Sequence, residues 1–136
     1  MRVLGLDVGE KTIGVAVSDE LGWTAQPLRV IRRSETDDGI AVVREIAEAY
    51  GVKTIVVGLP KNMNGTLGPQ AEKAMAFRTA LVAVTEIPVV MWDERLTTVA
   101  AQRALLEADV SRRRRRQVVD KIAAVFILQG YLDSRR

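Results

Sequence analysis

The chain has 136 residues, of which 48% are hydrophobic and 27% charged, and its formal net charge is +3. It contains no cysteine and no histidine, which excludes disulfides, thiolate or imidazole metal ligands, and a Ser-His-Asp triad. Acid–base and metal chemistry must therefore fall to carboxylates, lysine, tyrosine or hydroxyl groups. Carboxylates favour hard cations such as Mg²⁺ or Mn²⁺.

We expect a single domain over residues 1–136, because the sequence has neither an internal repeat nor a linker rich in proline and serine. The apolar runs are short and interrupted, which predicts no membrane span. A strand that begins at the N-terminus leaves no room for a signal peptide. Together with the absence of cysteine, these features predict a cytoplasmic protein.

Three strands are expected first along the chain. Apolar and β-branched runs predict strands over residues 2–6 and 12–18, joined by a short turn that contains Gly9. Residues 24–31 form a third predicted strand, which completes an antiparallel meander. A helix is expected to begin near Ser34 and to end at Gly51, because apolar residues recur at helical spacing between them.

The second half alternates strands and helices. The expected elements are a strand over 53–58, a loop over 59–68, a helix over 69–81, a strand over 87–92, a helix from Thr97 or Thr98 to about Glu107, a polar connector over 112–116 and a helix over 118–132. This order predicts an α/β fold, a five-stranded mixed sheet flanked by helices. Right-handed crossovers would make the fourth and fifth strands parallel to the first.

Acidic residues lie where two of these parallel strands end. Asp7 ends the first strand, and Asp93 and Glu94 follow the fifth. Ligands of open α/β sheets bind outside the carboxyl ends of the strands, so we expect these carboxylates to converge at one edge. Burying a carboxylate there costs several kcal/mol unless a cation or hydrogen-bond donors compensate it. A metal-bound phosphate is the compensation that the sequence favours.

A further acid, Asp120, lies near the beginning of the last predicted helix. It shares a helical face with the small residue Ala124 and with Ile127, which predicts a close approach of this face to the sheet. Two interpretations remain open from these residues alone. Asp120 either meets a cation at the sheet edge, or complements the helix N-terminus and pairs with Arg116.

Four segments, in order along the chain, resemble the motifs of the YqgF/RuvX family of ribonuclease H-like nucleases. They are LDVGEKTIGVA at 6–16, IVVGLPKNMNG at 55–65, DERLTT at 93–98 and VDKIAAVFILQ at 119–129. Members of this family are described as Holliday junction resolvases or as the nuclease that matures the 5′ end of small-subunit ribosomal RNA. The resemblance covers essentially the whole chain.

The resemblance implies a ribonuclease H-like fold and hydrolysis of a phosphodiester bond with two Mg²⁺ or Mn²⁺ ions. It assigns Asp7, Glu94 and Asp120 as catalytic acids and metal ligands, with Asp93 as a further candidate ligand. Adjacent residues at the end of an extended strand point in opposite directions, which favours Glu94 over its neighbour. Thr12 stands where many relatives have arginine, which would weaken a phosphate contact at the hairpin.

Basic and amide side chains near this edge are candidates for substrate contacts. They are Lys11, Asn62, Asn64, Arg95, Arg112, Arg113, Arg114, Arg115 and Arg116. The arginine run could bind phosphates, with a solvated connector as the alternative. Lys11 and Arg95 could equally pair with nearby acids, and the loop that carries the asparagines could be a simple turn between strand and helix.

The sequence thus predicts a metal-dependent nuclease that acts on precursor ribosomal RNA, with branched DNA as the alternative substrate. The protein would be a monomer or a homodimer, and paired cuts in a junction would require the symmetric dimer. Two other classes of protein fit the sequence less well. An actin-like ATPase or sugar kinase closes two such domains around its nucleotide, and a non-catalytic nucleic-acid-binding module has no need of all three acids.

Overall fold

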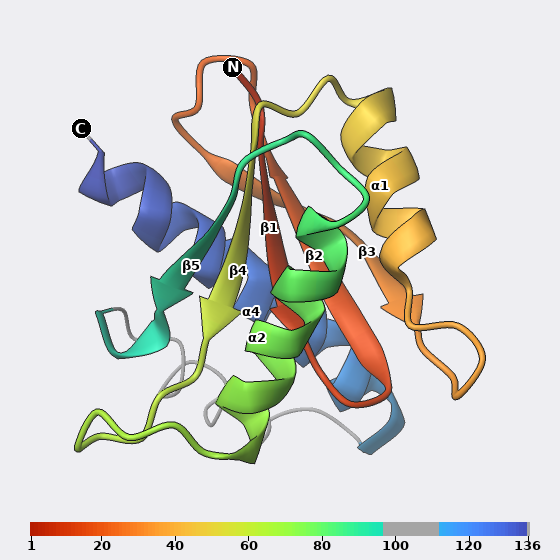
Figure 1. The fold of residues 1–136 in the computed structure, drawn as a ribbon. Helices are drawn as coiled ribbons and strands as arrows, with labels where there is room; N and C mark the ends of the chain where they lie inside the picture. The colour runs from red at the N-terminus through yellow and green to blue at the C-terminus, as the bar shows by residue number, and fades with distance from the viewer. Residues whose placement is uncertain (97–111, 136) are drawn as a thin grey trace.

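The computed structural model describes residues 1–96 and 112–135, and of residues 112–121 it describes only the backbone. Within these ranges the chain forms one five-stranded sheet in the order β3-β2-β1-β4-β5 (Figure 1). The strands are β1 (Val3–Val8), β2 (Thr12–Ser18), β3 (Ala25–Arg32), β4 (Thr54–Leu59) and β5 (Val89–Asp93). β1 pairs antiparallel with β2, and β2 with β3, whereas β4 is parallel to both β1 and β5. The predicted mixed sheet is confirmed.

Helices cover both faces of the sheet. In Figure 1, α1 and α2 lie in front of the sheet and α4 crosses behind it. Their bounds are α1 (Ile40–Ala49), α2 (Pro69–Val82) and α4 (Arg112–Ser134), and the short 3₁₀ helix η1 (Glu94–Leu96) follows β5 directly. None of the described helices combines the length and the apolar character needed to cross a bilayer.

Several predicted boundaries differ in the structure. The first strand extends through Val8, so Asp7 lies within it. Ser34 does not begin a helix, because its side chain and carbonyl accept hydrogen bonds from the amide of Asp37 within a turn. Helix α1 begins only after Gly39, whose φ of 87° is readily adopted by glycine. The fifth strand extends through Asp93, so this carboxylate belongs to the strand itself.

The arginine run is not a connector, contrary to the sequence-based prediction. The backbone of Arg112 to Arg116 forms the first turns of α4, which therefore begins six residues before the predicted position 118 and continues to Ser134. The reason is that arginine is among the better helix formers and no glycine or proline interrupts the run. The helix predicted from Thr97 or Thr98 to Glu107 lies outside the described residues.

Candidate active site

The carboxyl ends of β1, β4 and β5 meet at one rim of the sheet. Leu6 of β1 is level with Val57 of β4, so Asp7 lies level with Gly58 on the neighbouring strand. Gly58 is in turn paired with Trp92 of β5, one residue before Asp93. The register therefore brings the acids of the first and fifth strands to the same level, with a glycine between them.

Asp7 lies on the face of the sheet that α4 covers. Leu6 and Val8, on either side of it, belong to the core under α1 and α2. Since successive residues of a strand point to opposite faces, Asp7 points toward α4, as does Gly5, whose added Cβ would lie 2.6 Å from Leu128 Cβ. Asp7 is half-buried there.

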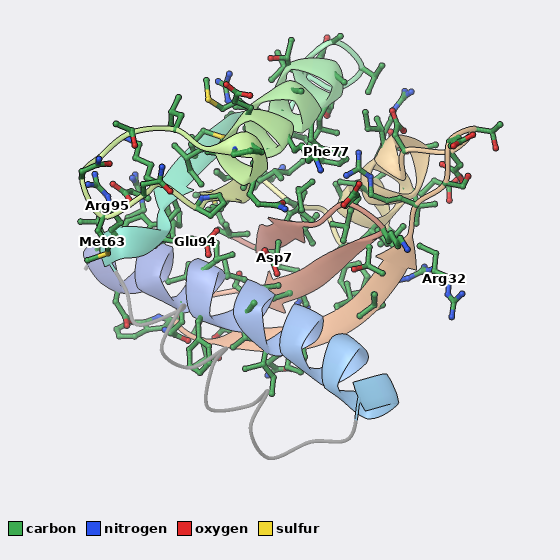
Figure 2. The ribbon with its side chains drawn as sticks, turned by 90° about the horizontal axis from the view of Figure 1, so that it is seen from below. Asp7, Arg32, Met63, Phe77, Glu94 and Arg95 are labelled. Carbon is green, nitrogen blue, oxygen red and sulfur yellow. The ribbon has the colours of Figure 1, made fainter. Side chains whose placement is uncertain are left out.

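Glu94 reaches the same face from β5. It is the first residue of η1 and only 8% exposed, which is unusual for a carboxylate. Its Oε2 atom is 3.0 Å from the position that a Cβ on Gly58 would take, so the carboxylate lies over β4. Adjacent strands are about 4.8 Å apart, so the Glu94 carboxylate lies roughly one strand spacing from β1, the strand that carries Asp7. Figure 2 looks onto this rim and shows the two residues near each other beside α4.

The backbone of α4 brings Asp120 toward this region. Asp120 precedes Ala124 by four residues, about one helical turn. The carbonyl oxygen of Ala124 is 3.2 Å from the position of a Cβ on Gly5, so the helix lies directly on β1 there. The side chain of Asp120 is outside the described part, and among the described side chains no group of three acids fit to hold a metal is present. The proposed acidic triad stays a prediction.

Asp93 is engaged by Arg95. The guanidinium donates from Nη2 to Oδ2 at 2.8 Å and from Nε to Oδ1 at 3.1 Å, and the amide of Arg95 donates to Oδ1 at 3.0 Å. The side-chain hydrogen bond from Arg95 lowers the pKa of Asp93, and the same bond raises the pKa of Arg95. Of the two interpretations of Arg95, the ion pair with a neighbouring acid is the one observed in this structure.

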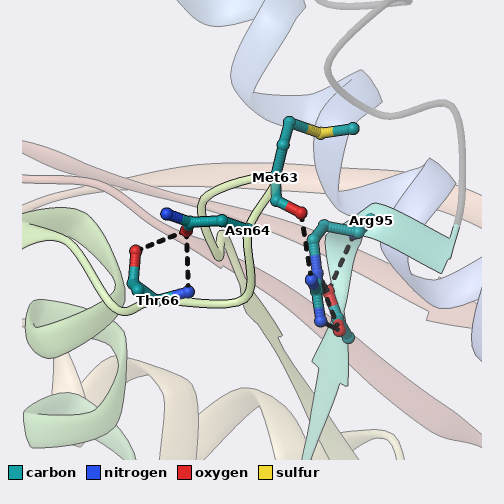
Figure 3. A network of polar contacts seen from close by, with 5 residues as sticks. Met63, Asn64, Thr66 and Arg95 are labelled. Atoms are coloured by element: carbon teal, nitrogen blue, oxygen red, sulfur yellow. Dashed lines mark hydrogen bonds and ion pairs between the residues drawn. The ribbon is translucent and has the colours of Figure 1, made fainter.

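The loop between β4 and α2 is ordered by its own polar groups (Figure 3). Asn62 Nδ2 donates to Thr66 Oγ1 at 2.9 Å, and that hydroxyl donates to Asn64 Oδ1 at 2.6 Å. Arg95 Nη1 donates to the carbonyl of Met63 at 3.4 Å, which ties the loop to η1. The amide side chains thus shape the loop, while its tip, Met63, is 89% exposed.

The remaining predicted contact residues lie around the same rim. Lys11 is exposed in the β1–β2 turn. The five arginines begin α4, and their side chains are outside the described part. The sequence reasoning missed Arg33, which follows β3 and donates to the carbonyl of Gly9 in the same turn at 2.6 Å. The available signal was its position, since β3 also ends at this rim.

Two solved structures with a similar fold are of proteins that act on Holliday junctions. The chain matches Thermus thermophilus RuvC in complex with a Holliday junction substrate with a TM-score of 0.62 and 16% identity, over 99% of this chain and 95% of that one. It matches the fowlpox virus Holliday junction resolvase with a TM-score of 0.57 and 17% identity, over the full length of both chains. At such identities the likeness establishes the fold, a RuvC-like ribonuclease H fold, as predicted.

Sequence comparison gives a much closer relation. The profile of the family described as "RuvX: Holliday junction resolvase" matches residues 1–134. Two relatives named "Putative pre-16S rRNA nuclease" come from Moorella thermoacetica, 63% identical over 98% of this chain and 95% of the relative, and from Clostridium tetani, 59% identical over 98% and 97%. The chain therefore belongs to the RuvX (YqgF) family of nucleases.

Proposed function

We propose that this RuvX-family nuclease cleaves the precursor of 16S ribosomal RNA in the cytoplasm, using divalent cations held by Asp7, Glu94 and Asp120. The observation that carries the proposal is the place of the Glu94 carboxylate, over Gly58 and on the same face as Asp7. The names of the relatives at about 60% identity support the choice of substrate.

The chemistry of these residues fits a magnesium or manganese site. All the candidate donors are carboxylate oxygens, which hard cations prefer. Two carboxylates on one largely buried face repel each other, and a shared cation relieves that repulsion. When bound, such ions lower the pKa of an attacking water and stabilise the leaving oxygen. Asp7 would hold the ions from β1 and Glu94 from the turn after β5, on either side of β4, and Asp120 would add a ligand from α4.

Asp93 and Arg95 have a supporting task in this proposal. Their bidentate pair fixes the turn after β5, so that Glu94 rather than Asp93 supplies the ligand on the α4 side. Lys11, Asn62 and Asn64 remain candidates for contacts with the flanking nucleotides. The five arginines at the start of α4 would bind phosphates, which predicts steeply salt-dependent binding.

Resolution of DNA junctions is the second candidate function, because the description of the matching family names it. It makes one additional demand. Symmetric cuts across a junction require two copies of the active site, hence a homodimer on the substrate. Measurement of the mass in solution, with and without a junction, decides whether that requirement is met.

The test offers the purified protein a labelled precursor RNA and a four-way DNA junction, each with Mg²⁺ and with Mn²⁺. We expect metal-dependent cleavage of the RNA and a loss of at least about a hundredfold in Asp7→Asn and Glu94→Gln. Glu48→Gln, an exposed acid on α1, is the matched control and should cleave normally. Undiminished cleavage by both rim variants would refute the site, and cleavage of the junction alone would refute the substrate.

A further inference from the structure

We infer that Arg33 is a positioning residue, which holds the β1–β2 turn, and with it Asp7, in the geometry that binds the cations. This inference rests on the proposed function. Arg33 follows the last residue of β3 and is half-buried. Neither the motifs of the sequence nor the comparisons assign it a role.

Arg33 donates to two carbonyls of the same turn. Its backbone amide donates to the carbonyl of Lys11 at 2.7 Å, and its Nη1 donates to the carbonyl of Gly9 at 2.6 Å. The turn itself is closed by a bond of 2.8 Å from the amide of Gly9 to the carbonyl of Thr12. One residue therefore fixes the turn from both its backbone and its side chain.

The guanidinium is itself anchored to the helical layer. Its Nε donates to the carbonyl of Asp38, just before α1, at 2.9 Å. Its carbon lies 5.4 Å from the centroid of the Phe77 ring on α2, a cation–π contact with a buried side chain. Only a planar fork with several donors makes these contacts together, so lysine is not an equivalent replacement.

The turn is coupled directly to the proposed metal site. Gly9 is two residues from Asp7, and Asp7 is paired with Gly14 in the same hairpin. A second link from hairpin to helix, Glu10 to Lys73 at 3.6 Å, involves exposed groups and restrains the turn only weakly. Loss of the Arg33 fork therefore allows the turn to shift against α1 and α2. Metal ligation is sensitive to displacements of this kind.

Arg78 supplies a matched control. It is also half-buried, and its Nε donates to a strand carbonyl, that of Val89, at 3.1 Å. Val89 begins β5, at the end of the sheet opposite the proposed site. Arg33→Gln and Arg78→Gln thus remove the same kind of contact from opposite rims of the sheet, and both are expected to lower the melting temperature.

The experiment compares Mg²⁺-dependent cleavage and amide hydrogen exchange in the wild type, Arg33→Gln, Arg33→Lys and Arg78→Gln. We expect Arg33→Gln to raise the Mg²⁺ concentration for half-maximal rate and to lower kcat, each by about tenfold, with KM for RNA little changed. Exchange should accelerate at the amide of Gly9. Arg33→Lys should recover only part of the loss, and Arg78→Gln should keep the wild-type metal dependence.

The outcomes separate this inference from the proposed function. If Arg33→Gln keeps the wild-type metal dependence and kcat while Asp7→Asn is inactive, the inference is wrong and the nuclease site stands. If the wild type cleaves nothing, the proposed function fails, and hydrogen exchange still decides the role of Arg33. Unchanged exchange at Gly9 in Arg33→Gln would overturn it in either case.

Discussion

The two faces of the sheet are built differently. The face under α1 and α2 is filled with large aliphatic side chains, among them Leu4, Leu6 and Leu81. The face under α4 has glycine at positions 5 and 58 where the helix crosses, and the helix meets them with Ala124 and Ile127. One face thus has large side chains between the sheet and its helices, whereas at the two glycines α4 lies directly against the strand backbone. Figure 1 shows the two sets of helices on opposite faces.

Because the two faces differ in this way, the residues that mainly stabilise the fold lie on one face and the residues of the proposed site lie on the other. Asp7 and Glu94 both lie on the α4 face, where small residues leave room for carboxylates beside the helix. The α1/α2 face supplies apolar burial, which is the main favourable contribution to folding. Substitutions on the α1/α2 face should therefore mainly lower the stability, and substitutions on the α4 face should mainly lower the rate of cleavage.

The largest expected effect on stability comes from Leu81→Ala on the α1/α2 face. Leu81 is fully buried, so its truncation leaves a cavity and should lower the free energy of unfolding by about 2–5 kcal/mol. Below the melting temperature, cleavage should stay within about twofold of the wild type, since Leu81 packs in the core on the opposite face of the sheet from the proposed site. Chemical denaturation and cleavage rates measure the two quantities. Val82→Ala, at a half-exposed neighbour, is the control. A large fall in the cleavage rate of folded Leu81→Ala would contradict the view that the α1/α2 face affects mainly stability.

On the α4 face, Gly58→Ala should mainly impair cleavage. The new Cβ would lie 2.5 Å from Ile127 Cδ1 and 3.0 Å from Glu94 Oε2. We expect the rate to fall by about a hundredfold as the carboxylate is displaced, and the free energy of unfolding to fall by about 1–3 kcal/mol.

A double variant distinguishes the two contacts of this alanine. Ile127→Ala, added to Gly58→Ala, removes the contact with the helix and leaves the contact with Glu94. The rate should therefore stay low even with the clash against α4 relieved. Recovery of the rate in the double variant would show that the position of α4, rather than that of Glu94, had been disturbed.

The sheet was predictable because each strand carries its own pattern. Strand β2 occupies Thr12–Ser18, as predicted. Its β-branched run is bounded by a turn on one side and by Asp19 on the other, and these neighbours fix where the strand begins and ends. The convergence of Asp7 and Glu94 followed from the same reasoning, because each acid adjoins an apolar strand of a parallel set.

The features that were not predicted correctly depend either on opposing local tendencies of the same residues or on contacts between residues far apart in the sequence. The predicted beginning of α4 at residue 118 was wrong, because a block of five like charges is typical of a solvated connector, whereas arginine also has a high helix propensity. Arg33 binds a carbonyl 24 residues away, through loops whose course no local pattern encodes. The pairing of Arg95 with Asp93 depends on the rotamers of the turn, so the sequence left it open against a phosphate contact.

A smaller expected effect concerns how the contribution of Asp93 to stability depends on pH. The hydrogen bond from Arg95 lowers the pKa of Asp93, so its stabilising contribution is complete above the ordinary aspartate pKa of about 4 and is lost as the pH falls through the lowered value. Asp93→Asn should therefore be less stable than the wild type at pH 7, and the difference should vanish in strong acid. Added salt should reduce the difference at pH 7.

Asp19, at the other end of the sheet, gives the contrasting case. Its pKa is lowered chiefly by the backbone amide of Trp23 rather than by a cation. The effect of Asp19→Asn should consequently respond less to salt than that of Asp93→Asn. Equal salt responses, measured by denaturation over a pH series, would argue against the ion pair as the source of the shift at Asp93.

The smallest expected effect tests how well the α4 face is packed. Trp92 packs edge-on against Tyr131 with ring centroids 6.4 Å apart, and its buried Nε1 has no hydrogen-bond partner among the described residues. An unsatisfied buried donor costs about 1–3 kcal/mol, so Trp92→Phe removes this cost while losing part of the buried ring. We expect the free energy of unfolding to stay equal or to rise by up to about 1 kcal/mol. A loss of more than about 1 kcal/mol in Trp92→Phe, measured by chemical denaturation, would contradict this expectation and show that the packing of the indole ring outweighs the cost of its unsatisfied N–H.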